Sequence, residues 1–198
     1  MELLETLADS DPLRLFGAWY AEAETSGLRV PDAVALATST QEGAPSARMV
    51  LVKEFDDRGF VFYSNYESRK GRELDANPRA ALLFYWDALR RQVRIEGDVE
   101  RLSEEESRAY FRTRPLGARL SALASRQSEV VESREVLEAA VEELRGRLGE
   151  EPEAPPYWGG YRLRPRVFEF WQHRDDRLHD RLRYRRDGSV WVRERLAP

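Results

Sequence analysis

The residues of this chain that could do chemistry stand out because their types are scarce. Lys53 and Lys70 are the only lysines, so 30 of the 32 basic residues are arginine. A lysine kept in an arginine-rich chain suggests a place where a compact ammonium is needed, for example against a phosphate. The only histidines are His173 and His179, and any imidazole acid-base chemistry must use one of them. Chance retention of the lysines and structural roles for the histidines are the alternatives.

Four short segments gather polar side chains that could hold an anion. They are Arg48 to Lys53, Ser68 to Lys70, Ser125 to Ser128 and Arg177 to Arg181. Strand alternation puts Arg48 and Lys53 on opposite faces unless the strand twists or bulges. The Ser-Arg-Lys run stands at a predicted helix start, where free N–H groups and the helix dipole favour an anion. An ordinary exposed helix turn is the alternative for that run.

Hydrophobic periodicity and turn residues predict the elements that position these segments. Helices are predicted over 11–27, 68–76, 103–114, 118–124 and 133–148. Strands are predicted over 33–39, 47–53, 60–64, 80–86, 92–101, 161–171, 182–186 and 190–195. Gly97 is a candidate bulge, and Asp187-Gly188 predicts a type I′ hairpin turn between the last two strands.

The element pattern favours a mainly β fold with peripheral helices (α+β). Hairpin spacing and short helices are typical of an antiparallel barrel of Greek-key type with helices outside it, rather than a parallel nucleotide-binding sheet. No glycine-rich phosphate loop is present, so any phosphate must be bound by side chains. We expect one domain over residues 1–198, with 1–10 flexible and 103–148 forming a helical excursion.

Composition excludes several classes of protein. The chain has 198 residues, 41% of them hydrophobic and 34% charged, with a net charge of -4. That balance argues against a dedicated nucleic-acid binder, although residues 161–198 are locally basic. The absence of cysteine excludes disulfides, thiolate metal sites and a cysteine nucleophile, and no metal site is predicted. No apolar stretch is long enough to span a membrane, which predicts a soluble cytoplasmic protein.

Several motifs, taken in order, carry a resemblance that runs from about Asp11 to Pro198. They are RMVLVK (48–53), FVFYSNYESRKGREL (60–74), RQVRIEG (91–97), YFRTRP (110–115), SRQS (125–128), WGGYR (158–162), FEFWQ (168–172) and RLHDRLRY (177–184), with a closing ERLAP. Each motif alone is unspecific. Together they resemble the pyridoxine (pyridoxamine) 5′-phosphate oxidase family, which implies an FMN-binding split β-barrel and a homodimer with each flavin held between subunits.

The resemblance also implies roles for individual residues. The FMN contacts would be Arg48, Met49, Val50, Leu51, Val52, Lys53, Tyr63, Ser64, Arg69, Lys70, Gln92, Gln127, Ser128, Trp171 and Arg181. The substrate contacts would be Lys53, Tyr110, Arg114, Arg177, Leu178 and His179, of which Arg177 and His179 would be catalytic. The implied activity is hydride transfer from substrate C4′ to FMN, with O₂ reduced to H₂O₂, which converts pyridoxine or pyridoxamine 5′-phosphate to pyridoxal 5′-phosphate.

Two departures from the family pattern concern the substrate rather than the flavin. Ala118 stands where the family has a phosphate-binding serine. The basic segment that precedes the core in other members is also not found, since the chain starts with Met1-Glu2-Leu3-Leu4-Glu5. Two alternatives are a related flavin oxidase of phenazine biosynthesis and a non-catalytic module that binds flavin or pyridoxal phosphate.

Overall fold

The computed structural model describes residues 3, 5 and 8–198. Its helices are α1 (Pro12–Thr25), α2 (Arg69–Ala76), α3 (Glu104–Thr113), α4 (Leu116–Ala124) and α5 (Arg134–Leu148), with a 3₁₀ turn η1 (Asp87–Leu89). Its strands are β1 (Ala33–Ser39), β2 (Pro45–Asp56), β3 (Gly59–Asn65), β4 (Arg79–Trp86), β5 (Arg91–Arg101), β6 (Trp158–Gln172), β7 (Asp180–Asp187) and β8 (Val190–Arg195). Every predicted helix and strand is present; β1 and β8 have the predicted ends, and the other six strands extend beyond theirs.

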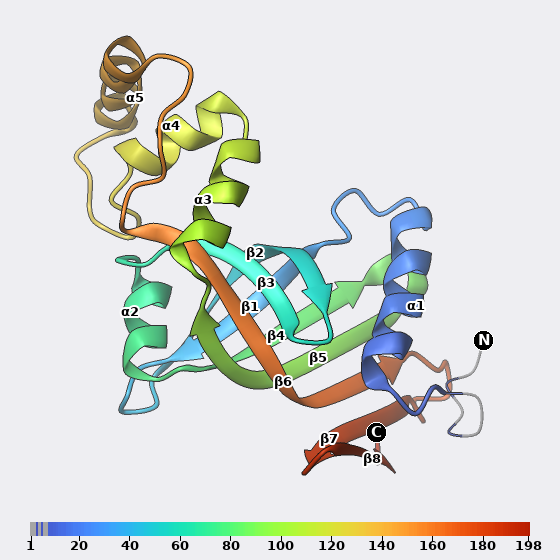
Figure 1. Ribbon diagram of the computed structural model, residues 1–198. Helices are drawn as coiled ribbons and strands as arrows, with labels where there is room; N and C mark the ends of the chain where they lie inside the picture. Colours follow the sequence, from blue (N-terminus) through green and yellow to red (C-terminus); the bar gives the residue numbers. More distant parts are fainter. Residues whose placement is uncertain (1–2, 4, 6–7) are drawn as a thin grey trace.

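The strands form one antiparallel sheet that closes on itself. Their order is β3-β2-β1-β4-β5-β6-β7-β8, and an additional pairing of β3 with β6 closes the first six into a barrel. Strand β4 returns beside β1, which is the Greek-key arrangement. Strands β7 and β8 continue the sheet beyond the barrel, at the lower edge of Figure 1. The predicted split-barrel fold is confirmed.

Helix α1 packs against the barrel through aromatic side chains. Asp11 caps the helix by accepting a hydrogen bond from the Leu13 N–H at 2.9 Å, and Pro12 occupies the first turn. Phe16 is fully buried, and its ring lies 4.8 Å from Phe60 and 5.1 Å from Phe84. These contacts join the helix to strands on both sides of the barrel core.

Two bulges interrupt the strand ladders. The register of β2 against β3 shifts between Val52 and Glu54, which leaves Lys53 as the extra residue. The register of β5 against β6 also shifts between Glu96 and Gly97, at the predicted place, but the extra residue is Arg166 on β6, so Gly97 lies opposite the bulge instead of forming it. A Cβ at Gly97 would meet the Arg164 carbonyl oxygen at 2.0 Å, so a larger residue does not fit there.

The segment between β5 and β6 is helical, as predicted. Ser103 forms the expected capping box with Glu106 at the start of α3. Helix α5 stands away from the barrel beside α4 (Figure 1), and none of its residues is buried. None of the helices in the described ranges has the length and apolar character needed to cross a membrane.

The turn between β7 and β8 differs from its prediction, and the predicted flexible segment 1–10 lies partly outside the described residues. The β7–β8 turn is centred on Gly188-Ser189, with Asp187 paired to Val190. A type I′ turn needs a positive φ at both central residues, whereas a type II′ turn needs it only at the first. Gly188 has a positive φ of 59° and Ser189 does not. The predicted type I′ turn is therefore wrong. The predicted flexible segment 1–10 includes residues 1–2, 4 and 6–7, which lie outside the described residues; Asp9 accepts a hydrogen bond from the Tyr184 hydroxyl at 2.7 Å.

Replacing Phe16 by alanine tests how far the barrel depends on α1. The substitution leaves a cavity among aromatic rings and should lower the free energy of unfolding by about 3–5 kcal/mol. Urea denaturation followed by tryptophan fluorescence measures the loss. Arg14→Ala on the same helix is the control, since Arg14 is exposed and its loss should cost within about 0.5 kcal/mol. Equal stability of the two variants would contradict the packing role of Phe16.

Candidate functional site

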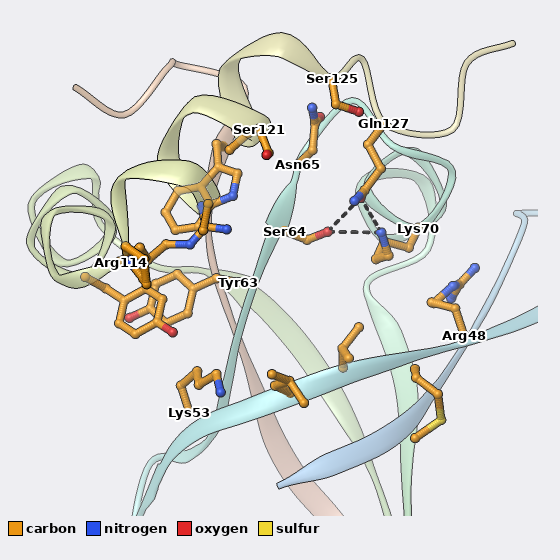
Figure 2. Close-up of a pocket in the computed structure, with 18 of the residues that line it drawn as sticks. Arg48, Lys53, Tyr63, Ser64, Asn65, Lys70, Arg114, Ser121, Ser125 and Gln127 are labelled. Carbon is orange, nitrogen blue, oxygen red and sulfur yellow. Dashed lines mark hydrogen bonds between the residues drawn. The ribbon is translucent and has the colours of Figure 1, made fainter. Parts of the chain in front are cut away.

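A cavity of about 880 Å³ opens between the barrel and the helices α3 and α4 (Figure 2). Eleven residues predicted for the site line it: Arg48, Met49, Val50, Leu51, Lys53, Tyr63, Ser64, Lys70, Tyr110, Arg114 and Gln127. Arg48 and Lys53 reach the same cavity because the β2 bulge falls at Lys53 and offsets strand alternation. The bulge alternative left open by the sequence is therefore the one that the fold adopts.

Lys70 is a buried ammonium at the cavity wall with neutral partners. Its Nζ donates to Gln127 Oε1 at 2.6 Å, to Ser64 Oγ at 3.0 Å and to Ser68 Oγ at 3.3 Å (Figure 2). No carboxylate among the described residues forms an ion pair with it. Burial, with the nearby positive charge of Arg48, lowers the pKa of Lys70 to about 8. A cation held this way attracts an anion from the cavity side.

Arg114 is a second cation without a carboxylate partner in the described part of the chain. Its guanidinium lies 4.8 Å from the centroid of the Trp158 ring, and its buried Nη1 has no hydrogen-bond partner there. Burial lowers the pKa of Arg114 from its ordinary value, but an arginine stays charged. Next to it the rings of Tyr63 and Tyr110 stack at 3.8 Å. This wall can therefore combine a flat aromatic surface with an unsatisfied donor for an anion.

The remaining cations of the site are already paired with carboxylates. Glu73, 5% exposed, forms ion pairs with Arg48 at 3.2 Å and with Arg69 at 2.9 Å. Lys53 forms an ion pair with Asp32 at 2.7 Å. The site thus contains paired cations on β2 and at the start of α2, and unpaired ones in Lys70 and Arg114.

Residues Arg69 and Ser128 lie at the edge of the cavity rather than in its lining. The Arg69 N–H at the start of α2 donates to Ser128 Oγ at 3.1 Å. Ser128 has a positive φ of 76°, so the chain turns sharply there and brings Gln127 onto Lys70. The SRQS segment is thereby fixed against the first turn of α2.

Val52 is the one predicted site residue of β2 that does not line the cavity, because its side chain is buried in the core.

The other predicted residues form a second group at the far end of the sheet. Gln92 pairs with Trp171 between β5 and β6, and Trp171 pairs with Arg181 on β7. The His179 ring lies 4.8 Å from that of Trp171, and its Nδ1 accepts a hydrogen bond from the Arg174 N–H at 3.0 Å. Glu169, 2% exposed, fixes Arg181 at 2.7 Å.

Two residues of this second group lie in the loop before β7. Arg177 adopts a positive φ of 68°, which is uncommon for a residue with a side chain. Leu178 next to it is 68% exposed. Residues 175–178 of this loop are all exposed.

One protomer does not bring the two groups together. Trp158 lines the cavity at one end of β6 and Trp171 belongs to the second group, 13 residues further along the strand. At about 3.3 Å per residue the strand path between them is roughly 40 Å. The predicted contacts therefore split into two separate surfaces of the same chain.

Comparison with known proteins identifies the family. Residues 21–147 match the family model described as pyridoxamine 5′-phosphate oxidase. Residues 158–198 match the pyridoxine 5′-phosphate oxidase C-terminal dimerisation region.

The chain belongs to the pyridoxamine 5′-phosphate oxidase family. Similar curated proteins are the pyridoxine/pyridoxamine 5′-phosphate oxidases of Rubrobacter xylanophilus, 60% identical over 99% of this chain and 91% of the relative, and of Bordetella pertussis, 56% identical over 99% and 93%. The structure of PhzG from Burkholderia lata, in complex with tetrahydrophenazine-1-carboxylic acid, is also similar. It is 40% identical, with a TM-score of 0.92 over 96% of this chain and 94% of that one.

The fold also matches a pyridoxamine 5′-phosphate oxidase-related, FMN-binding protein of Nostoc punctiforme, at 20% identity and a TM-score of 0.75 over 95% of this chain and 98% of that one. The protein is thus an oxidoreductase of this family with a region for forming a homodimer, and FMN is the family's cofactor. The cavity suits a flavin phosphate, because a buried lysine without a carboxylate partner among the described residues lines it from the first turn of α2.

Two residues of this oxidase, Glu73 and Trp158, were not among the predicted site residues. Glu73 joins two of the predicted arginines, and its spacing of four residues from Arg69 on a helix was the available signal. Trp158 stacks under Arg114, and only its place in the WGGYR motif pointed to it. Ala118 lines the cavity, so the hydroxyl that the family pattern places there is absent from this wall.

The titration of Lys70 predicts a pH dependence of FMN affinity. Below about pH 8 Lys70 is protonated in the free protein. Above that pH Lys70 must take up a proton when the FMN phosphate dianion binds. The affinity for FMN should therefore fall, by up to about tenfold per pH unit. Fluorescence titration of the apoprotein with FMN between about pH 7 and 9.5 measures this, in a range where the phosphate is already fully ionised. Lys70→Arg keeps its charge and should remove the slope. The same slope in both proteins would contradict the role of Lys70.

Proposed function

We propose that the protein is an FMN-dependent oxidase that converts pyridoxine 5′-phosphate, pyridoxamine 5′-phosphate or both to pyridoxal 5′-phosphate. The observation that carries this proposal is a single cavity with two cations, Lys70 and Arg114, that have no carboxylate partner among the described residues. Two anions, the phosphates of a flavin and of a substrate, are what such a cavity would accept. The 56–60% identity to named oxidases over nearly the whole chain supports the same reaction.

FMN, when bound, supplies the acceptor for the hydride that leaves substrate C4′ and returns both electrons to O₂, which is reduced to H₂O₂. With the alcohol substrate, the products are pyridoxal 5′-phosphate and H₂O₂; with the amine, water also enters and ammonia leaves. The protein's own part is to bind, orient and exclude water. The Tyr63 and Tyr110 pair offers a flat apolar surface for this, and burial raises the pKa of Tyr63 to about 12, so its hydroxyl stays protonated.

The substrate phosphate is assigned to Lys53, Tyr110 and Arg114. Arg114 offers its unsatisfied Nη1, and Tyr110 offers a phenol on the same wall. Lys53 contributes only when its ammonium is shared between Asp32 and the phosphate. Because Ala118 supplies no hydroxyl, Arg114 carries more of the phosphate binding here than in a chain with serine at that position.

The pyridine ring is assigned to Arg177, Leu178 and His179, with Arg177 and His179 as the catalytic pair. His179 accepts from a backbone N–H at Nδ1, which leaves Nε2 as the nitrogen that carries a proton toward a ligand. Gln92, Trp171 and Arg181 accompany them as flavin contacts.

We assign each complete site to two protomers, with the cavity of one facing the second group of the other. The outer face of β2, β1 and β4 supports this assignment. Met49, Ala35 and Leu83 are neighbours across these strands, and Met49 and Tyr85 are more than 60% exposed. An apolar sheet face of this kind is typical of a subunit interface. Met49 also lines the cavity, which places the cavity beside the face that a second copy would cover.

Turnover of the FMN-loaded protein tests the proposed reaction. Either phosphorylated vitamer in air should yield pyridoxal 5′-phosphate absorbance and an equal amount of peroxide. Bound flavin without turnover of either vitamer would contradict the proposal. In that case tetrahydrophenazine-1-carboxylic acid, the compound bound in the similar PhzG structure, distinguishes a phenazine oxidase from a binding module.

Mixing two inactive variants tests the shared site. Arg114→Ala damages the cavity and Arg177→Ala damages the second group, so each homodimer should lose activity. After random subunit exchange, half the dimers are mixed and each mixed dimer holds one intact site, so about a quarter of the wild-type activity should return. A site built within one chain would restore none. Two Arg114→Ala chains carrying different tags are the control for exchange.

A further inference from the structure

Glu73 is a buried carboxylate of helix α2 to which neither the sequence motifs nor the proposed reaction gives a role. Its Oε2 accepts hydrogen bonds from the hydroxyls of Thr38 on β1 and Ser46 on β2, the latter at 2.6 Å. The same oxygen contacts Arg48 at 3.2 Å, and Oε1 contacts Arg69 at 2.9 Å. One side chain thus connects α2 with the two strands beside it.

The same two hydroxyl groups also accept hydrogen bonds from the Arg48 guanidinium. Its Nη1 donates to Thr38 Oγ1, and its Nη2 donates to Ser46 Oγ. The guanidinium is therefore fixed by two hydroxyls that are themselves fixed by Glu73. A free arginine side chain loses about 2 kcal/mol of rotamer entropy when it is ordered. Arg48 has already lost that freedom before any ligand arrives.

We propose that Glu73 is a positioning residue that holds Arg48 and Arg69 in the orientation that receives the flavin phosphate. The inference rests on the proposed function, since it concerns the FMN site of the same cavity. Arg48 lines the cavity, and Arg69 lies on the first turn of α2 directly before Lys70. Glu73 contacts both arginines and is not among the residues that line the cavity.

The trio also limits the positive charge around Lys70. Two arginines and one glutamate leave a net charge of +1 beside the ammonium. Arg48 opposes the protonation of Lys70 and Glu73 favours it, while Ser64, Ser68 and Gln127, its direct partners, are neutral. Burial alone would raise the pKa of Glu73, but its four hydrogen bonds outweigh burial and lower the pKa to about 2. Glu73 is therefore ionised wherever the protein is folded and functional.

Two opposite effects of Glu73→Gln separate positioning from simple electrostatics. If the carboxylate of Glu73 only reduces the positive charge around Lys70, its removal should tighten FMN binding. If it positions the arginines, its removal should weaken FMN binding by about tenfold, the scale of one charge-assisted hydrogen bond. Riboflavin, which lacks the phosphate, should lose less than about twofold in the positioning case.

Fluorescence titration of the apoproteins with FMN and with riboflavin makes this measurement without turnover. Asp75→Asn is the matched control, because it removes the same charge from the same helix. Asp75 forms an exposed ion pair with Arg101 at 2.6 Å. The control should leave both affinities unchanged. Tighter FMN binding in Glu73→Gln, or equal losses for FMN and riboflavin, would overturn the proposal.

A second readout comes from pH. Without the carboxylate, Lys70 faces Arg48 uncompensated, so the alkaline decline in FMN affinity should begin at a lower pH than in the wild type. Below that decline Lys70 is protonated in both proteins, so a loss of FMN affinity that disappeared there would come from the Lys70 charge alone and would overturn the proposal. If Glu73→Gln does not fold, Thr38→Val removes one hydroxyl that joins Glu73 to Arg48 and should show a smaller loss selective for FMN. Failure of the wild type to bind FMN would instead overturn the proposed function itself.

Discussion

The pairing of β3 with β6 closes the barrel, and the site is built along that seam. Tyr63 pairs with Gly160 and Ser64 with Gly159, so two cavity residues project from the strand that makes the closing contact. The seam requires glycine on β6: a Cβ at Gly160 would lie 2.5 Å from a Leu102 methyl group, and one at Gly159 would lie 2.0 Å from the Tyr66 hydroxyl. A Cβ at Gly160 would also lie 2.9 Å from the Tyr63 ring, so glycine there leaves room for Tyr63, Tyr110 and Trp158 to stack in one layer. The flat wall of the cavity is thus a direct result of how the sheet closes.

Charge in the cavity is distributed unevenly, and this distribution follows from what each side chain faces. Arg48 on β2 and the exposed Arg69 on α2 both face the carboxylate of Glu73. Lys70 and Arg114 point into regions lined by serine, glutamine and aromatic rings, which can solvate a cation partly but cannot neutralise it. Leaving these two charges without a counterion costs folding free energy, and an anionic ligand is the group that recovers it. The same trade between stability and function is common at binding sites.

Sequence patterns predicted the elements well because the local signals agreed with the fold. The Asp11 cap, the Ser103 capping box and the alternating burial of β1 each point to one structure, and each is present. The chain positions of the cavity residues came from motifs, whereas their grouping did not, because it depends on non-local pairing. Only the three-dimensional register places Val52 in the core while Lys53 enters the cavity. The turn type at Gly188 was missed for a related reason, since strand register decides which two residues occupy the turn.

The length of β6 has a thermodynamic consequence. Its 15 residues separate the two groups of site residues along one hydrogen-bonded ladder, which cannot fold back on itself. If each complete site is shared by two protomers, as we propose, a ligand that touches both groups touches two chains at once, and its binding free energy is coupled to that of subunit association. This coupling is reciprocal: the free energy by which the bound ligand stabilises the dimer equals the free energy by which the dimer tightens binding of the ligand. In such an arrangement the cofactor belongs to the subunit interface as much as to either polypeptide.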